Sequence, residues 1–147
     1  MIRSPSLLLP AAARARIAKA AEGAYPEECC GLLIGRREGG GLIEITDVAE
    51  SDNVAPPPRH NRFEVDPALR FALIRRLRGS PEEIVGHYHS HPDAPPFPSA
   101  RDIDGAFEAD LVWLIVAVAG GVPGWPAAFL PDPAAGSFVP LSLTLRG

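Results

Sequence analysis

The sequence predicts an α+β domain in which a mixed β-sheet is flanked by helices. Short apolar runs bounded by glycine and proline have the length of strands, and they alternate with segments that have the apolar spacing of helices. Apolar residues make up 46% of the 147 residues, enough for one hydrophobic core and too many for a disordered chain. Because no internal repeat or second domain is visible, we expect a single domain over residues 1–147.

The first 50 residues predict one helix and one β-hairpin. Residues 10–24 begin at a proline, are rich in alanine and contain a glycine near their end, as helices do. Residues 29–35 form an apolar run between glycines and predict a buried strand. Three glycines at 39–41 predict a turn, and residues 42–48 predict the second strand of the hairpin.

The middle of the chain predicts a loop followed by a second helix. Residues 51–62 are rich in proline and polar side chains, and residues 63–65 predict a brief strand after them. A helix is then expected from Pro67 to Gly79. Its apolar face is predicted to consist of Leu69, Leu73, Ile74 and Leu77.

The second half of the chain predicts four strands and one short helix. The helix begins at Ser99, after a loop with three prolines at residues 93–98. The strands are expected at residues 83–91, 111–119, 125–130 and 137–145. The long apolar run at 111–119 predicts a central strand that is buried on both faces.

Composition and charge exclude several classes of function. The formal net charge is −4 and no basic stripe is present, so nucleic acid is not an expected partner. The apolar stretch at residues 7–9 is too short for a secretory signal, and no run is long enough to cross a membrane. Cys29 and Cys30 are adjacent and form no framework of disulfides, so they are expected in the core of a cytoplasmic protein.

Three of the four histidines fall within five residues, at positions 87, 89 and 91. In a strand, residues two apart project to the same face, so the pattern places imidazole rings side by side. One metal ion could take two of these rings. Pro92 follows directly and ends the strand, which places His91 near the next loop.

A catalytic zinc usually takes three protein ligands and leaves one position to water. Asp102 is the best candidate for the third ligand, because the loop from Pro92 to Pro98 brings the first turn of the following helix back to the strand edge. Asp104 and Asp93 are the rival ligands.

Hydrolysis at such a site also needs a base and an oxyanion donor. Glu28, at the start of the first predicted strand, is the candidate base, but the residues alone do not select it over Glu27 or Glu83. The Ser99 hydroxyl is a candidate donor to the oxyanion. Ser99 and Asp102 also have the spacing of a helix capping box, which is a purely structural explanation for the pair.

Four segments together resemble the MPN+/JAMM family of zinc metalloproteases. Residues 89–92 read His-Ser-His-Pro, and after a gap of six residues 99–102 read Ser-Ala-Arg-Asp, which is similar to the family signature His-x-His-Pro followed by Ser-x-x-Asp. Residues 26–35 are similar to the segment that carries the family's catalytic glutamate, and residues 62–67 are similar to a segment of its short bacterial members. The resemblance covers nearly the whole chain.

The resemblance implies a fold and a role for each site residue. The fold would be the MPN/JAMM architecture, which is cytidine-deaminase-like. Zinc would be bound by His89, His91 and Asp102. Glu28 would be the general acid and base, and Ser99 would stabilise the oxyanion.

The resemblance also implies a substrate class. Short bacterial members process ubiquitin-like sulfur-carrier proteins at the C-terminal Gly-Gly tail, so the chain is expected to be a peptidase or isopeptidase acting on such a carrier. The long insertions of the eukaryotic deubiquitinating members are absent, which argues against polyubiquitin as substrate. The sequence names neither the carrier, the type of bond nor the oligomeric state.

The same residues also bear on other functions and other roles. A non-catalytic MPN scaffold would lack the ligands present here, whereas a small-molecule amidohydrolase could use the same site. A zinc deaminase is excluded, because His-x-Glu and Pro-Cys-x-x-Cys are missing. His87 matches no place in the signature and is expected near the ligands or in the core. Trp113, with its apolar neighbours, is expected in the core. Asn53 follows the hairpin and could line a substrate groove, but a turn is the expected position for it, and Trp125 either packs on the sheet or lines a groove.

Overall fold

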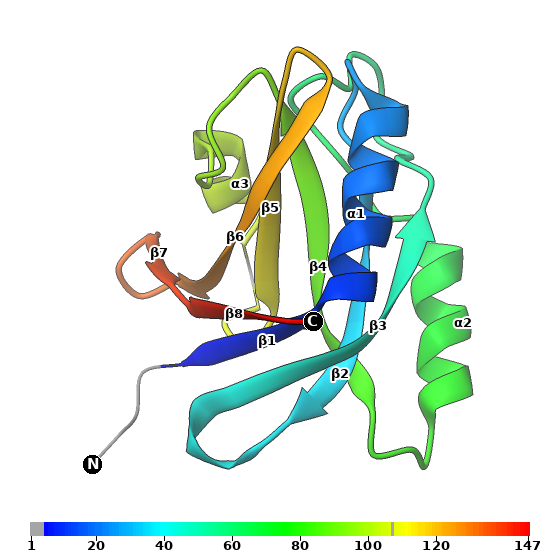
Figure 1. Cartoon of the computed structure of the whole chain (residues 1–147), viewed down its shortest axis with the longest axis vertical. Helices are drawn as coiled ribbons and strands as arrows, with labels where there is room; N and C mark the ends of the chain where they lie inside the picture. The colour runs from blue at the N-terminus through cyan, green and yellow to red at the C-terminus, as the bar shows by residue number, and fades with distance from the viewer. Residues whose placement is uncertain (1–4, 107) are drawn as a thin grey trace.

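The computed structural model describes residues 5–106 and 108–147. Its strands are β1 (Ser6–Pro10), β2 (Cys30–Arg37), β3 (Leu42–Ser51), β4 (Glu83–Pro92), β5 (Val112–Ala119), β6 (Val122–Asp132), β7 (Ser137–Pro140) and β8 (Ser142–Arg146). They form one eight-stranded sheet with the order β7-β6-β5-β4-β2-β3-β1-β8 (Figure 1). The sheet is mixed. Strand β1 runs parallel to β3 and β8, and β4 runs parallel to β5, whereas the other neighbouring strands run antiparallel.

The helices lie where the sequence predicts them. They are α1 (Ala11–Ala24), α2 (Pro67–Leu77) and α3 (Ala100–Asp104). Pro10 is the N-cap of α1. Asp66 caps α2 by accepting a hydrogen bond from the Ala68 N–H at 3.0 Å. None of the helices in the described part of the chain has the length and apolar character needed to span a membrane.

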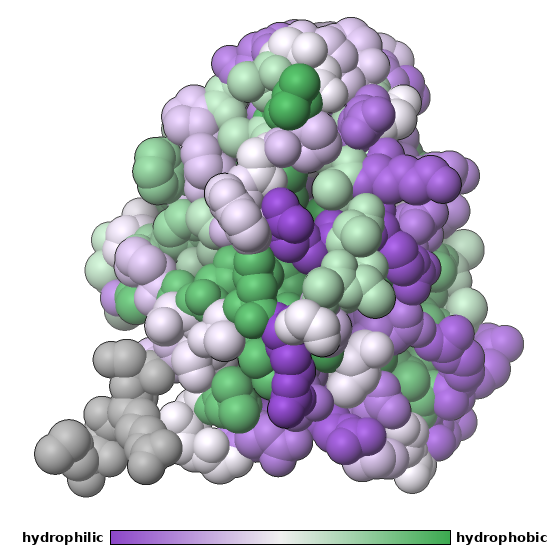
Figure 2. Space-filling view, in the orientation of Figure 1, coloured by the Kyte–Doolittle hydropathy of each residue, from purple (hydrophilic) through white to green (hydrophobic). Residues whose placement is uncertain are grey.

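The sheet is covered on both faces, with α1 and α2 on opposite sides (Figure 1). In β2, Leu33 packs in the same cluster as Ile17 of α1, whereas Leu32 and Ile34 pack with Leu73 of α2. Strand β2 is therefore apolar at successive positions because both of its faces are buried. Figure 2 shows hydrophilic residues gathered along the side of the molecule that carries α2.

Strand β5 is buried in the same way and places the candidate site. Leu114 belongs to the core beneath α1, and Trp113 belongs to a separate aromatic cluster on the other face. Tyr88 of β4 also lies in the core beneath α1. Since side chains alternate along a strand, the histidines on either side of Tyr88 project from the face opposite α1.

Two predictions about the strands are wrong, and one strand was not predicted. Residues 137–145 do not form one strand: β7 and β8 lie at opposite edges of the sheet, and between them the Leu141 N–H donates to the Ala128 carbonyl at 2.8 Å. Residues 63–65 form no strand, only an isolated bridge between Asn53 and Val65. Strand β1 was not predicted, although Leu7 is fully buried.

The apolar face of α2 is narrower than predicted. Leu73 is buried, whereas Ile74 is 47% exposed and turns outward beside Phe71. Residues one apart on a helix project about 100° from each other, so only one of the two neighbours can face the sheet squarely.

Candidate active site

Three predicted ligand residues converge at the end of β4. The Nε2 atoms of His89 and His91 are 3.1 Å apart, and Asp102 Oδ2 lies 3.1 Å from His91 Nε2 and 3.5 Å from His89 Nε2. All three residues are buried. Ligand atoms placed about 2.0–2.1 Å from a tetrahedral metal ion lie about 3.3 Å from one another. The spacing of these three atoms therefore fits a shared metal ion.

Local structure fixes Asp102 beside the histidines. Ser99 is the N-cap of α3, and its Oγ accepts a hydrogen bond from the Asp102 N–H at 3.1 Å. In return, the Ser99 N–H donates to Asp102 Oδ2 at 2.8 Å. The capping box expected from the spacing is thus present, and it orients the same carboxylate oxygen that faces the histidines.

The histidine rings are held by different contacts. His91 Nδ1 lies 2.9 Å from the Pro95 carbonyl, so Nδ1 carries the proton and donates, leaving the Nε2 lone pair free for a metal. The His89 ring stacks on Phe63 with 4.1 Å between the ring centroids. Neither Pro95 nor Phe63 was predicted from the sequence, because a backbone carbonyl and a ring distant along the chain leave no local pattern.

Burial and close approach set the charges of the cluster. Burial alone would raise the pKa of Asp102, but hydrogen bonds with His89 and His91 hold this pKa well below its usual range. Burial lowers the pKa of His89. For His91, burial also acts to lower the pKa, but contact with Asp102 and the Pro95 carbonyl raises it. The cluster therefore pairs an ionised carboxylate with imidazole nitrogens, as a metal site requires.

Glu28 lies beside this cluster, just before β2. It is 4% exposed, and within the described residues its Oε1 atom has no hydrogen-bond partner. Burial raises the pKa of Glu28 to about 8, and the nearby His91 acts against this rise. A carboxyl group with this pKa can both accept and release a proton near neutral pH. The rivals Glu27 and Glu83 are exposed.

The backbone of Glu28 is fixed by the loop that follows β3. The Glu28 N–H donates to the Arg59 carbonyl at 2.8 Å. The Asn53 side chain donates to the Glu28 carbonyl at 3.1 Å and to the Arg62 carbonyl at 3.0 Å. Asn53 Oδ1 also accepts from the Ala55 N–H, which is the turn contact expected of an asparagine. The sequence predicted the turn but not the link to Glu28.

The rival aspartates are directed elsewhere. Asp93 accepts hydrogen bonds from the Tyr25 hydroxyl at 2.6 Å and from the Gly120 N–H at 2.8 Å. Asp104 is exposed at the end of α3. Neither carboxylate belongs to the group that converges on the histidines.

His87, the two cysteines and Trp125 lie outside the group of converging ligand atoms. His87 packs edge-on to the buried Trp113, with ring centroids 4.4 Å apart, and does not belong to the converging group. Cys29 and Cys30 are buried free thiols. Trp125 is 66% exposed, with the Arg14 guanidinium 4.0 Å above its ring.

The sequence matches one protein family and several relatives. Residues 10–129 match the family described as prokaryotic homologs of the JAB domain. The chain is 36% identical over 95 residues to a desampylase of Haloferax volcanii, and 33% identical over 107 residues to a probable TtuB-protein conjugate cleaving protease of Thermus thermophilus. These matches cover 65% and 73% of this chain, and 66% and 64% of the two relatives, slightly less than two thirds of each.

A solved structure supports the same fold. The solution structure of a protein from Desulfitobacterium hafniense superimposes with a TM-score of 0.82 at 27% identity. The superposition covers 95% of this chain and 92% of that one. The mixed sheet and its helices are therefore shared over nearly the whole chain.

Proposed function

This chain belongs to the family of prokaryotic homologs of the JAB domain, and from that premise we propose that it is a zinc-dependent peptidase or isopeptidase. The bond hydrolysed would follow the C-terminal Gly-Gly tail of a ubiquitin-like protein. The observation that carries the proposal is the buried convergence of His89, His91 and Asp102 beside Glu28, whose buried Oε1 has no hydrogen-bond partner among the described residues. The names of the relatives, a desampylase and a probable conjugate cleaving protease, support this substrate class.

Two nitrogen ligands and one oxygen ligand are a common donor set for catalytic zinc. His89, His91 and Asp102 would hold the ion, which when bound supplies a Lewis acid. The free buried thiols Cys29 and Cys30 are compatible with the reducing cytoplasm, where we place the reaction.

Glu28 and Ser99 then have separate roles in hydrolysis. Glu28 takes a proton from the attacking water as the water oxygen bonds to the scissile carbonyl carbon. The Ser99 hydroxyl, whose oxygen already accepts from the Asp102 N–H, donates its own proton in a hydrogen bond to the oxyanion. When the carbon–nitrogen bond breaks, Glu28 returns the proton to the leaving amine. The products are a carboxylate on the carrier tail and a free amine.

Mass spectrometry of a ubiquitin-like carrier tests this reaction. The carrier extends two residues beyond Gly-Gly and is incubated with the zinc-loaded protein, with and without a chelator. We expect a mass loss that corresponds to cleavage after the second glycine and that the chelator abolishes. Cleavage that continues at full rate in the presence of the chelator would contradict the metal-dependent mechanism, and an intact carrier would contradict the substrate class.

A further inference from the structure

A cavity of about 600 Å³ opens beside the metal-ligand cluster, and we call it the arginine pocket. The loop that precedes α2, α2 itself, α3 and strands β4 and β5 contribute to its walls. The side chains used below are Arg62, Arg70, Arg101, Phe63, His87 and Trp113. Asp102 also lines the pocket, so the pocket is continuous with the cluster.

Positive charge exceeds negative charge in the arginine pocket. Three arginines line it, against Glu64 and the metal-ligand candidate Asp102, which is already engaged by the histidines. Of the three, Arg70 also pairs with Glu108 at 3.4 Å, so Arg62 and Arg101 are the two offered to a ligand. Within the described residues, Arg62 Nε and His87 Nδ1 are buried and have no hydrogen-bond partner. Buried polar atoms without a partner are costly, so a ligand that pairs with these atoms would gain free energy of binding.

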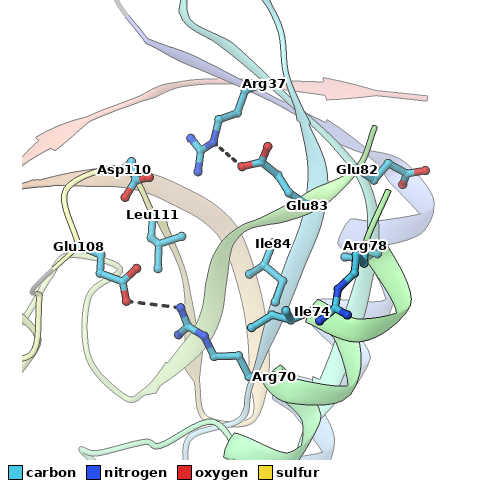
Figure 3. Close-up of a pocket in the computed structure, with 11 residues that line it drawn as sticks. Arg37, Arg70, Ile74, Arg78, Glu82, Glu83, Ile84, Glu108, Asp110 and Leu111 are labelled. Carbon is cyan, nitrogen blue, oxygen red and sulfur yellow. Dashed lines mark hydrogen bonds and ion pairs between the residues drawn. The ribbon is translucent and has the colours of Figure 1, made fainter. Parts of the chain in front are cut away.

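A neighbouring pocket of about 430 Å³, drawn in Figure 3, provides an internal comparison. Its arginines face carboxylates: Arg37 pairs with Glu83 at 3.0 Å, and Arg70 pairs with Glu108 at 3.4 Å (Figure 3). Glu82 and Asp110 line it as well. Four carboxylates therefore line this neighbouring pocket against three arginines, whereas three arginines line the arginine pocket against two carboxylates, with Arg70 at the boundary of both.

The strand register places the arginine pocket and Glu28 on different sides of the cluster. Cys30 pairs with His89 in the antiparallel β2–β4 ladder, so Glu28, two residues earlier, comes opposite His91. The arginine pocket instead contacts β4 at His87. Glu28 gives its proton to the leaving amine, so the amine lies on the Glu28 side. An acyl part that leaves the cluster on the side opposite the amine would extend towards the arginine pocket.

We propose that the arginine pocket selects carrier tails with an acidic side chain shortly before the Gly-Gly pair. This inference rests on the proposed function, because it assumes that a tail occupies the cluster. An extended chain advances about 3.3–3.6 Å per residue, so two glycines separate the scissile carbonyl from the preceding residue by about 7 Å. Guanidinium groups bind carboxylates through paired, charge-assisted hydrogen bonds. The rings of Phe63 and Trp113 offer apolar contact to the methylene groups of the same side chain.

Binding of product peptides tests the inference without any need for turnover. Peptides that end in Glu-Gly-Gly, Gln-Gly-Gly and Lys-Gly-Gly are titrated into the zinc-loaded protein, and a second set carries the variable residue one position earlier. We expect the glutamate peptide of at least one set to bind about tenfold more tightly than its glutamine counterpart, and the lysine peptide to bind most weakly. The preference is expected to shrink at high salt.

Variants of the pocket sharpen the test. Arg62→Gln and Arg101→Gln should each reduce the preference for glutamate, whereas Arg76→Gln, at an exposed position on α2, should leave it unchanged. Arg101→Glu should shift the preference towards the lysine peptide. The melting temperature of each variant is measured first, so that a folding defect is not mistaken for lost recognition.

The binding and cleavage experiments can contradict the inference and the proposed function independently of each other. Equal affinity for the three peptides, or no binding by any of them at millimolar concentration, overturns the inference. If extended carriers are cleaved at rates that ignore the charge of this residue, the proposed function stands and the inference falls. If no carrier is cleaved but the glutamate peptide binds preferentially, the proposed function falls and the anion-selective pocket stands.

Discussion

The two ends of β4 carry polar groups in opposite surroundings. At the start of the strand, Glu83 lies 3.0 Å from Arg37, and their side chains are 55% and 31% exposed. At the other end, His89 is fully buried, and His91 and Asp102 are only 5% and 7% exposed. Water screens the first pair, so its contribution to stability is small. The second group has lost its hydration and must be compensated by its neighbours.

This difference indicates which end of the strand is functional. An exposed ion pair can be replaced at little cost to the fold, so its presence says little about function. A buried group of two imidazoles, one carboxylate and the unpaired Glu28 carboxyl lowers stability in the absence of a ligand, and such groups persist where chemistry requires them. We therefore expect substitutions at the buried end to change activity by orders of magnitude, and substitutions at the exposed end to change little.

The largest effect is expected for His91→Ala. The variant should lose metal and activity together, because His91 supplies one of the three ligand atoms that converge. Residues that only orient a ligand typically change metal affinity by about 10–100-fold, so a direct ligand should exceed that. Competition with a chromogenic chelator measures the affinity. His60→Ala, at an exposed histidine in the loop before α2, serves as the control. Full metal occupancy in His91→Ala would move the ligand set elsewhere, with His87 as the next candidate.

The next largest effect is expected for Glu28→Gln. The amide keeps the shape of the side chain but cannot shuttle a proton, so turnover should fall about 10²–10⁴-fold while metal affinity is unchanged. The exposed neighbour provides a matched control, since Glu27→Gln makes the same chemical change one residue away. Steady-state cleavage and metal content are measured on both proteins. A wild-type rate in Glu28→Gln would show that another group acts as the base.

Ser99→Ala separates two roles of one hydroxyl. If Ser99 donates to the oxyanion, kcat should fall about 100–1000-fold. If it serves only as the helix cap, the loss is limited to about 1 kcal/mol of unfolding free energy, and kcat stays near the wild-type value. Kinetics and thermal unfolding of the same preparation distinguish these outcomes. Ser99→Thr keeps a hydroxyl that can cap and donate, and it should recover most of the lost activity.

Local patterns explain why so much of the fold and the cluster could be predicted. The apolar run of β2 and the alternating histidines of β4 each depend on one strand, and the capping box depends on four consecutive residues. The spacing between His91 and Asp102 is bridged by a short loop, so their contact is nearly local as well. The choice of Glu28 came from family resemblance, and the structure places this residue next to the cluster.

The features that could not be predicted depend on distant segments. Strand β8 lies beside β1 from the other end of the chain, and a short apolar run does not reveal its partner. The Pro95 carbonyl that fixes the His91 ring carries no side-chain signal. The link from Asn53 to the Glu28 backbone joins residues 25 apart, and the arginine pocket gathers side chains from several elements. Such contacts are set by tertiary packing and not by local propensity.

The smallest effect is expected at the exposed end of β4. A double-mutant cycle of Arg37→Ala and Glu83→Ala, followed by urea unfolding, should give a coupling free energy of about 0–1 kcal/mol, because both side chains keep much of their hydration in the pair. Cleavage rates of the three variants should match the wild type, since neither residue touches the cluster. A coupling well above this range would mean that water does not screen this end of β4. A fall in cleavage rate would mean that the pocket in Figure 3 also contacts the substrate. The two ends of β4 would then differ in the burial of their polar groups but not in whether they serve the reaction.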